Sequence, residues 1–241
     1  TRTVIAACRR AGVRRLVHTS TVNTLGVPGK GCVGDERTPP DSRLHAMGYV
    51  ATKRTAESLA LAANGPGLEV VAVNPGTVFG PGDVHANAGS YILAAARLPV
   101  IACPPGGTSC VHIDAVTRGH LAAYERGRAG ERYILGGENL TYREIFRIIA
   151  EALGKQPRIL AVPPAPAVAL AFLLERAADL AGIDMPLSAD AARAGSLRLY
   201  YSSRKARQEL DLPFLPFRLA AREAVEWYRA EGFLGDLPLG S

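Results

Sequence analysis

The sequence predicts an α/β protein with a doubly wound parallel sheet and a smaller, mainly helical lobe toward the C-terminus. Strand-like and helix-like segments alternate through the first half of the chain, which is typical of such sheets. The run LEVVAVNP at residues 68–75 is apolar almost throughout, as expected for a strand buried on both faces. Beyond residue 83 the elements become shorter and more helical, which indicates the second lobe.

The first half contains further elements before this buried strand. They are expected to be a helix over residues 1–12, a strand over 13–21, a long loop over 26–45 and a helix over 46–63. Two of the strands end in polar residues, HTST at 18–21 and NPG at 74–76. Ligands in parallel sheets bind at the carboxyl ends of the strands, so these two ends are the candidate site.

The second half mixes short strands with helices. We expect helices over residues 90–98, 141–153, 165–181 and 218–231, strands over 132–137 and 158–163, and a strand followed by a helix over 109–127. Thr141 and Glu144 have the spacing of a capping box, which predicts that the helix begins there. A turn is expected at GPGD, residues 80–83.

The charge pattern limits the possible partners. The chain has 241 residues and a formal net charge of +6, but its arginines are scattered and form no long basic run. Such a pattern indicates a solvated surface, and a phosphate-bearing cofactor or substrate is the alternative. The aromatic platforms that are typical of RNA-binding proteins are missing, so no nucleic-acid partner is expected.

The cysteines and the apolar segments bear on the compartment. The four cysteines have neither zinc-site nor disulfide spacing, which predicts reduced thiols in a cytoplasmic protein and no metal site. The uncharged run from Ile159 to Leu174 is shorter than a membrane span and contains three prolines. We expect a buried helix there, or a weak association with a membrane surface.

Tyr49 and Lys53 form the motif YVATK on the helix expected over residues 46–63. Residues four apart share one face of a helix, so the ammonium and the phenol are expected to be neighbours. A neighbouring cation favours the phenolate form of a tyrosine, which can then transfer protons. The alternative is a chance pair on a solvated helix face.

Several motifs in this order resemble the extended short-chain dehydrogenase/reductases, also called the NAD-dependent epimerase/dehydratase family. They are HTST (18–21), YVATK (49–53), VNPGTVFGPGD (73–83) and VHIDAVTRGHLAA (111–123). The segments GERYILGGENLTYREI and YYSSRKARQEL and the closing AVEWYRAEGFL are similar to bacterial hopanoid-associated sugar epimerases. Dihydroflavonol-reductase-like and 3β-hydroxysteroid-dehydrogenase-like members are also similar. The resemblance covers essentially the whole chain.

The resemblance implies a division into two parts. Residues 1–83 would be the remaining part of a Rossmann-like NAD(P)-binding domain. Residues 84–241 would form mainly the substrate-binding lobe, with the strand and helix near 109–127 returning to the first domain. The substrate would be a small molecule, either sugar-like or a hydrophobic alcohol or ketone. Many relatives dimerise, so a homodimer is expected.

The resemblance also assigns roles to single residues. Tyr49 would be the catalytic acid/base, Lys53 would favour its phenolate and bind the nicotinamide ribose, and Thr21 would polarise the substrate oxygen. The residues expected to bind NAD or NADP are Thr19, Tyr49, Lys53, Asn74, Pro75, Gly76, Thr77, Val78 and Ser90. A capping role is the alternative for Thr21, and a tight turn is compatible with the binding role of residues 74–78.

Six other residues have mainly structural interpretations. His18 and His112 are expected to be structural, because no triad of metal ligands surrounds them. Asp114 is the expected N-cap of its helix. Tyr200 and Tyr201 fit either a substrate pocket or ordinary packing, and Trp227 is expected in the core.

One part of the family pattern is missing. The family begins with a GxxGxxG loop between a strand and a helix, which holds the cofactor pyrophosphate. The segment GKGCVG at 29–34 has glycines, but no strand precedes it and no helix follows. We expect the chain to be a fragment of a longer enzyme rather than a natural short protein. The alternatives to an enzyme are an inactive fragment and a non-catalytic nucleotide-binding, RNA-binding or scaffold protein of the same fold.

Overall fold

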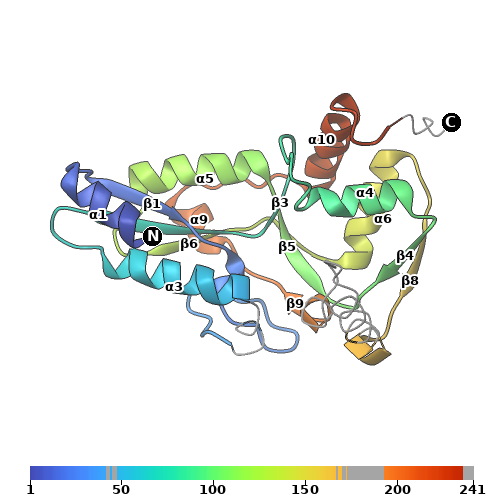
Figure 1. Cartoon of the computed structure of the whole chain (residues 1–241), viewed down its shortest axis with the longest axis horizontal. Helices are drawn as coiled ribbons and strands as arrows, with labels where there is room; N and C mark the ends of the chain where they lie inside the picture. Colours follow the sequence, from blue (N-terminus) through green and yellow to red (C-terminus); the bar gives the residue numbers. More distant parts are fainter. Residues whose placement is uncertain (42–43, 45–47, 167, 170–171, 173–192, 236–241) are drawn as a thin grey trace, which may run out of the picture.

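Figure 1 shows the computed structural model of the chain, which describes residues 1–41, 44, 48–166, 168–169, 172 and 193–235. The first sheet has three parallel strands in the order β1-β2-β6, namely β1 (Arg15–Thr19), β2 (Glu69–Pro75) and β6 (Arg132–Leu135). Thr19 pairs with Val73, so β1 and β2 end at the same edge. Among the described residues, no strand pairs with the outer edge of β1.

Helices cover both faces of this sheet. They are α1 (Arg2–Arg10), α3 (Gly48–Ala62), α5 (Ile113–Arg126) and the short α9 (Arg204–Glu209). Figure 1 shows α3 along one side of the sheet and α5 along the other. Val70 packs with Ile5 of α1 and Ala60 of α3, whereas Val71 and Val73 pack in the cluster that contains α5. Alternate side chains of β2 are therefore buried on opposite faces, which confirms the strand predicted from its apolar run.

The second lobe is built around another sheet. Its strands are β3 (Thr77–Phe79), β5 (Gly107–His112), β7 (Glu138–Thr141) and β9 (Arg198–Leu199). β5 pairs in parallel with β3 and β9 and antiparallel with β7. A separate parallel pair joins β4 (Val100–Cys103) to β8 (Arg158–Ala161).

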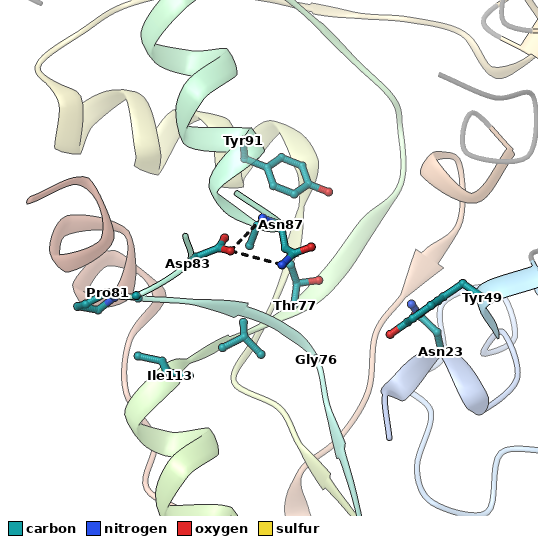
Figure 2. A pocket seen from close by; sticks show the side chains of 13 residues that line it. Asn23, Tyr49, Gly76, Thr77, Pro81, Asp83, Asn87, Tyr91 and Ile113 are labelled. Atoms are coloured by element: carbon teal, nitrogen blue, oxygen red, sulfur yellow. Dashed lines mark hydrogen bonds between the residues drawn. The ribbon is translucent and has the colours of Figure 1, made fainter. Parts of the chain in front are cut away.

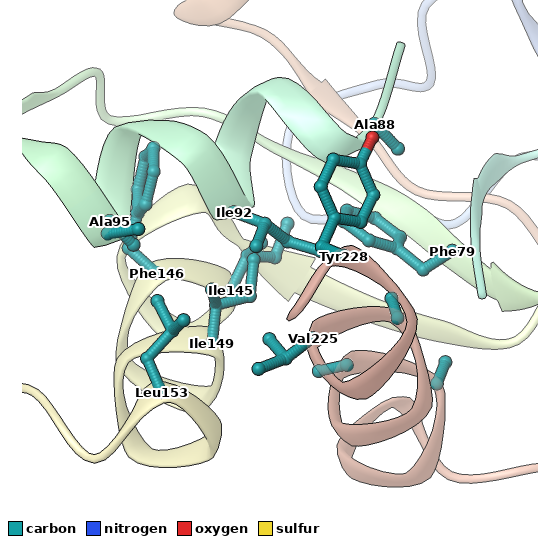
Figure 3. Close-up of a cluster of buried hydrophobic side chains, with 14 of the residues drawn as sticks. Phe79, Ala88, Ile92, Ala95, Ile145, Phe146, Ile149, Leu153, Val225 and Tyr228 are labelled. Carbon is teal, nitrogen blue, oxygen red and sulfur yellow. The ribbon is translucent and has the colours of Figure 1, made fainter. Parts of the chain in front are cut away.

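Helices α4 (Gly89–Arg97), α6 (Tyr142–Leu153) and α10 (Phe217–Ala230) pack together beside this sheet. Figure 3 shows their shared core, in which Ile92, Ile149 and Tyr228 are fully buried. Trp227 packs against this core and is half-buried, as expected. In the part of the chain that the structure describes, no helix is both long enough and apolar enough to cross a bilayer.

One expectation about the second lobe is wrong. The strand near residues 109–127 does not return to the first sheet, since β5 pairs within the second sheet and β6 is the returning strand. The helix α5 does pack on the first sheet. In the described residues, six short strands follow residue 76 outside the first sheet, alongside the helices of the lobe. Most of these strands have two to four residues, which is too few to show a periodic pattern.

The helix ends test three other expectations. Thr141 and Glu144 form the capping box, with the Glu144 amide donating to Thr141 Oγ1 at 3.2 Å. The N-cap of α5 is His112 rather than Asp114, because His112 Nδ1 accepts the amide proton of Asp114 at 3.0 Å. The other His112 nitrogen lies 3.0 Å from Glu223, so this histidine is structural, as predicted. The helix predicted over residues 165–181 lies largely outside the described residues, and the division at residue 83 stays a prediction.

Gly76 is the point where the chain passes from β2 to β3. A Cβ on Gly76 would lie 2.3 Å from the carbonyl oxygen of Ser109. This oxygen belongs to the backbone of β5, so it cannot move aside without disturbing the second sheet. Only glycine allows β3 to approach β5 this closely.

We therefore expect Gly76→Ala to destabilise the protein by about 1–3 kcal/mol, the usual cost of overpacking. Urea unfolding of the variant and the parent chain measures the difference. Gly65→Ala is the matched control, because a Cβ there meets no atom within 4 Å. Equal stability of the two alanine variants would contradict the tight approach at Gly76.

Candidate active site

A cavity of about 550 Å³ lies where β2 leaves the first sheet and β3 enters the second. Figure 2 shows Tyr49 and Asn23 on one side of it and Tyr91, Asn87 and Asp83 on the other. Its lining residues are Asn23, Tyr49, Gly76, Thr77, Val78, Gly80, Pro81, Gly82, Asp83, Asn87, Ala88, Tyr91 and Ile113. The cavity is therefore at a carboxyl-terminal strand edge, where parallel sheets bind ligands.

Tyr49 lies in the first turn of α3 and is 57% exposed. A tyrosine normally buries its ring, so an exposed ring that lines a cavity is free to contact a ligand. Lys53 follows one turn later and its ammonium donates to the carbonyl oxygen of Thr19 at 3.3 Å. The same helix therefore presents the phenol to the cavity and anchors the ammonium at the end of β1.

Thr19 and Thr21 lie at the end of β1 but differ in their contacts. Thr19 is exposed, and its hydroxyl lies 2.9 Å from His120 Nε2 on α5. Thr21 is half-buried and caps the short helix η1 (Val22–Thr24), its hydroxyl accepting from the Asn23 amide at 3.4 Å. Asn23 lines the cavity, whereas Thr21 is not among the lining residues. The capping role weighed for Thr21 is thus observed, and its catalytic role stays a prediction.

The segment expected to line the nicotinamide divides into two parts. Asn74 and Pro75 are buried within the fold, whereas Gly76, Thr77 and Val78 line the cavity. Ser90 does not line it, since its hydroxyl donates to the Asn87 carbonyl at 2.8 Å on an exposed part of α4.

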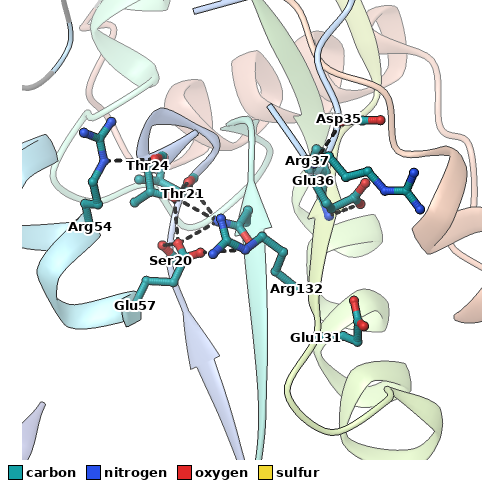
Figure 4. Close-up of polar contacts among 12 residues, drawn as sticks. Ser20, Thr21, Thr24, Asp35, Glu36, Arg37, Arg54, Glu57, Glu131 and Arg132 are labelled. Atoms are coloured by element: carbon teal, nitrogen blue, oxygen red, sulfur yellow. Dashed lines mark hydrogen bonds and ion pairs between the residues drawn. The ribbon is translucent and has the colours of Figure 1, made fainter. Parts of the chain in front are cut away.

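A buried carboxylate connects the elements that carry these residues. Glu57 of α3 is only 2% exposed and accepts hydrogen bonds from Thr24 Oγ1 at 2.6 Å, from Asn74 Nδ2 at 2.9 Å and from the Ser20 hydroxyl. Its other oxygen forms an ion pair with Arg132 of β6 at 3.2 Å. Figure 4 shows this cluster. One side chain therefore holds the Tyr49 helix against the ends of β1 and β2 and against β6.

Asn74 extends the same network. Its amide also donates to the Thr21 carbonyl and to Thr24 Oγ1, both at 3.1 Å. The backbone of Thr21 is thereby fixed relative to the strand that leads to Gly76.

His18 lies on β1 beside this network, and its Nε2 is buried with no hydrogen-bond partner in the described part of the chain. Burial lowers the pKa of His18 below its usual value, and the positive charge of Lys53 lowers it further. The carboxylate of Glu57 raises the pKa but does not outweigh the burial. His18 is therefore neutral in the folded protein at pH 7, and protonating it opposes folding.

Stability should consequently fall as the pH drops. In the unfolded chain His18 binds a proton near pH 6.5, whereas in the folded chain it binds one only at a lower pH. The free energy of unfolding therefore decreases as the pH falls from about 6.5 through the lower pKa of the folded chain. Above the unfolded pKa the full stability is present. We expect His18→Gln to remove part of this loss, as measured by thermal unfolding across the acidic range.

His85→Gln is the control for His18, because His85 is exposed on the turn before α4. It should leave the pH profile of stability unchanged. A His18→Gln variant with the parental pH profile would show that His18 does not contribute.

Nine of the thirteen residues that line the cavity were not predicted as site residues, among them Asn23, Asp83, Asn87, Tyr91 and Ile113. Asp83 accepts from the amides of Asn87 at 3.0 Å and Gly89 at 2.8 Å, and so holds the start of α4. Tyr91 stacks on Tyr142 with ring centroids 6.0 Å apart, and burial raises the pKa of both phenols. The turn at GPGD was the only available signal, because the cavity wall on α4 depends on how the second lobe packs.

Comparisons with known proteins agree with this arrangement. The model of the 3-beta hydroxysteroid dehydrogenase/isomerase family matches residues 1–126. A putative dihydroflavonol 4-reductase of Synechocystis is 32% identical over 97% of this chain, which spans 70% of that protein. The crystal structure of gox2253 superposes with a TM-score of 0.80 at 32% identity, covering 96% of this chain and 71% of the other.

An epimerase is also similar. The UDP-glucose 4-epimerase of Thermus thermophilus, solved in complex with NAD, is 26% identical with a TM-score of 0.67, covering 93% of this chain and 67% of its own. The matches include the segments that carry Tyr49, Lys53 and the end of β2. The chain therefore belongs to the extended short-chain dehydrogenase/reductases, a family of NAD(P)-dependent oxidoreductases, epimerases and dehydratases.

Proposed function

We propose that the chain carries the catalytic part of an NAD(P)-dependent oxidoreductase or epimerase that transfers hydride at a carbinol or carbonyl carbon. The observation that carries this proposal is the exposed Tyr49 at the cavity, with Lys53 one turn further along the same helix. Membership of the family supports it, because the relatives are named as reductases and epimerases.

Tyr49 would transfer the proton. In the reducing direction its phenol donates to the substrate oxygen while the carbon gains hydride, and in the oxidising direction the phenolate accepts the proton. The ammonium of Lys53 would stabilise the phenolate. The Thr21 hydroxyl uses a lone pair in its cap, so its own proton is available for the same substrate oxygen.

The residues present fit the nicotinamide half of the cofactor, which supplies the hydride donor or acceptor when bound. The Lys53 ammonium has one hydrogen bond to Thr19 and two further protons that could reach ribose hydroxyls. Gly76, Thr77 and Val78 would lie along the nicotinamide, with Gly76 free of any side chain. Five of the residues predicted to bind the cofactor do not line the cavity, so they would contact it only from outside: Thr19, Lys53, Asn74, Pro75 and Ser90.

The substrate would occupy the remaining cavity between Tyr49 and Tyr91. The polar groups of Asn23 and Asn87 and the aromatic face of Tyr91 suit a sugar-like molecule or a hydrophobic alcohol or ketone. Both substrate classes stay predictions, as do the homodimer and the cytoplasmic location.

Nuclear magnetic resonance titration of the chain with NADH, NADPH and nicotinamide mononucleotide tests the proposal. The mononucleotide carries only the half for which this chain has residues, so it should bind even if the pyrophosphate site lies elsewhere. The amide signals of Asn23, Gly76, Thr77 and Val78 should shift in a saturable way. Absence of such shifts with all three compounds would contradict the proposed cofactor site.

A further inference from the structure

A second cavity, of about 480 Å³, lies between the turn at residues 29–32 and the segment that leads into β9. Lys30 and Arg198 both line it, one from each side. They are 168 residues apart in the sequence, so only the fold brings these two cations together. None of the residues that were assigned to Tyr49 chemistry lines this cavity.

The charges of this cavity are not balanced within the described part of the chain. Lys30 and Arg198 are exposed, and neither side chain has a hydrogen bond or ion pair with another described residue. The described lining contains no Asp or Glu. Two like charges repel each other at one site, and an anion between them would offset that repulsion.

Tyr200 also lines this cavity, but its hydroxyl lies over Gly107 of β5, 2.6 Å from where a Cβ on that glycine would stand. Its hydroxyl has no hydrogen bond to any described residue, although the side chain is half-buried. Burial raises the pKa of Tyr200 even though Arg198 acts in the opposite direction. The phenol therefore keeps its proton at neutral pH and adds no charge to the cavity.

The backbone around the cavity is fixed before any ligand arrives. The Gly34 amide donates to the Tyr200 carbonyl at 2.8 Å, and the Ser202 amide donates to the Gly34 carbonyl at 2.8 Å. At the other end of the loop, the Tyr201 hydroxyl donates to the Gly26 carbonyl at 2.9 Å. The loop from 26 to 34 is thus held at both ends against the segment that carries Arg198 and Tyr200. This favours binding, because the loop loses little conformational entropy when a ligand binds.

We propose that this cavity binds a phosphate group through Lys30 and Arg198. A phosphate carries close to two negative charges at neutral pH and has several acceptor oxygens, which matches two cations. The planar guanidinium of Arg198 can bind two of these oxygens at once. The phosphate belongs to a free metabolite or forms part of a larger phosphorylated ligand, and the site does not depend on hydride transfer at Tyr49.

Titration of the whole chain with inorganic phosphate, followed by amide signals at constant ionic strength, tests the site. We expect saturable shifts at Lys30, Gly31 and Arg198, and little change at Gly76 or Thr77. Arg198→Gln should weaken phosphate binding by about tenfold, the loss expected for a charge-assisted hydrogen bond. Lys30→Gln combined with Arg198→Gln should abolish saturable binding.

Arg204→Gln is the matched control, because it removes one exposed positive charge from α9, outside the cavity. It should leave the phosphate affinity unchanged. Equal weakening by Arg204→Gln and Arg198→Gln, or shifts that chloride reproduces at the same concentration, would overturn the proposal. Unchanged amide spectra of the variants without phosphate would show that they remain folded.

A phosphate monoester and a nucleoside diphosphate distinguish the two sources of the phosphate. Tighter binding of either compound than of inorganic phosphate, lost in Arg198→Gln, would indicate the larger ligand. Equal affinities would indicate the free ion. Because nicotinamide mononucleotide is expected to shift signals near Gly76, failure of one site would be seen independently of the other.

Discussion

Replacing Tyr49 by Phe should lower turnover by roughly one hundred- to ten thousand-fold, the usual contribution of a general acid or base. The phenyl ring keeps the shape but has no proton to transfer. Because Tyr49 is 57% exposed, its hydroxyl contributes little to folding, and thermal stability should stay within about 0.5 kcal/mol of the parent. The measurement is the oxidation of NADH or NADPH by carbonyl substrates, using the protein that carries this chain.

Tyr124→Phe is the matched control for this experiment. Tyr124 is 49% exposed on α5 and lines no part of the cavity. The control should keep full turnover, so that any loss in Tyr49→Phe cannot be a general effect of removing an exposed phenol. Normal turnover in Tyr49→Phe would end the proposed mechanism, while the family membership would stand.

Replacing Glu57 by Ala should destabilise the fold by about 3–5 kcal/mol, as expected when one partner of a buried ion pair is removed. The substitution removes the shared acceptor of the Ser20 and Thr24 hydroxyls and the Asn74 amide, and it removes the carboxylate that pairs with the Arg132 guanidinium. For a chain of this length, that loss corresponds to a fall in melting temperature of roughly 6–20 °C. Thermal unfolding followed by circular dichroism measures it.

Two further variants separate the causes. Glu57→Gln keeps the size of the side chain but loses its charge, so it should lie between the parent and Glu57→Ala. Glu125→Ala removes an exposed carboxylate from α5 and should change stability by less than about 0.5 kcal/mol. If Glu57→Ala and Glu125→Ala both had the melting temperature of the parent, the Glu57 network would not stabilise the fold.

The sequence predicted best those elements whose pattern reflects their own burial. The apolar run of β2 indicated a strand covered on both faces, and the Thr141 capping box located the start of α6. The spacing of Tyr49 and Lys53 indicated one helix face, which α3 provides. Each of these signals lies within a few consecutive residues, where periodicity and capping chemistry act directly.

Glu57 illustrates what the sequence could not indicate. In the sequence, Glu57 resembles any carboxylate on the solvated face of a helix. Its burial depends on partners from the ends of β1 and β2 and from β6. The pairing of β5 with β3 was missed for a similar reason, because short strands carry too little pattern to identify their neighbours.

The sequence by itself therefore determined the α/β class, the principal helices and strands, and the Tyr49–Lys53 pair that carries the resemblance to the family. The tertiary structure alone decided which side chains meet at the Tyr49 cavity, which carboxylate is buried beneath it, and that Lys30 and Arg198 face one space. The physical reason is the range of the interactions. Local hydrogen bonding and hydrophobic periodicity can be followed along the chain, whereas contacts between distant residues exist only after the elements have packed.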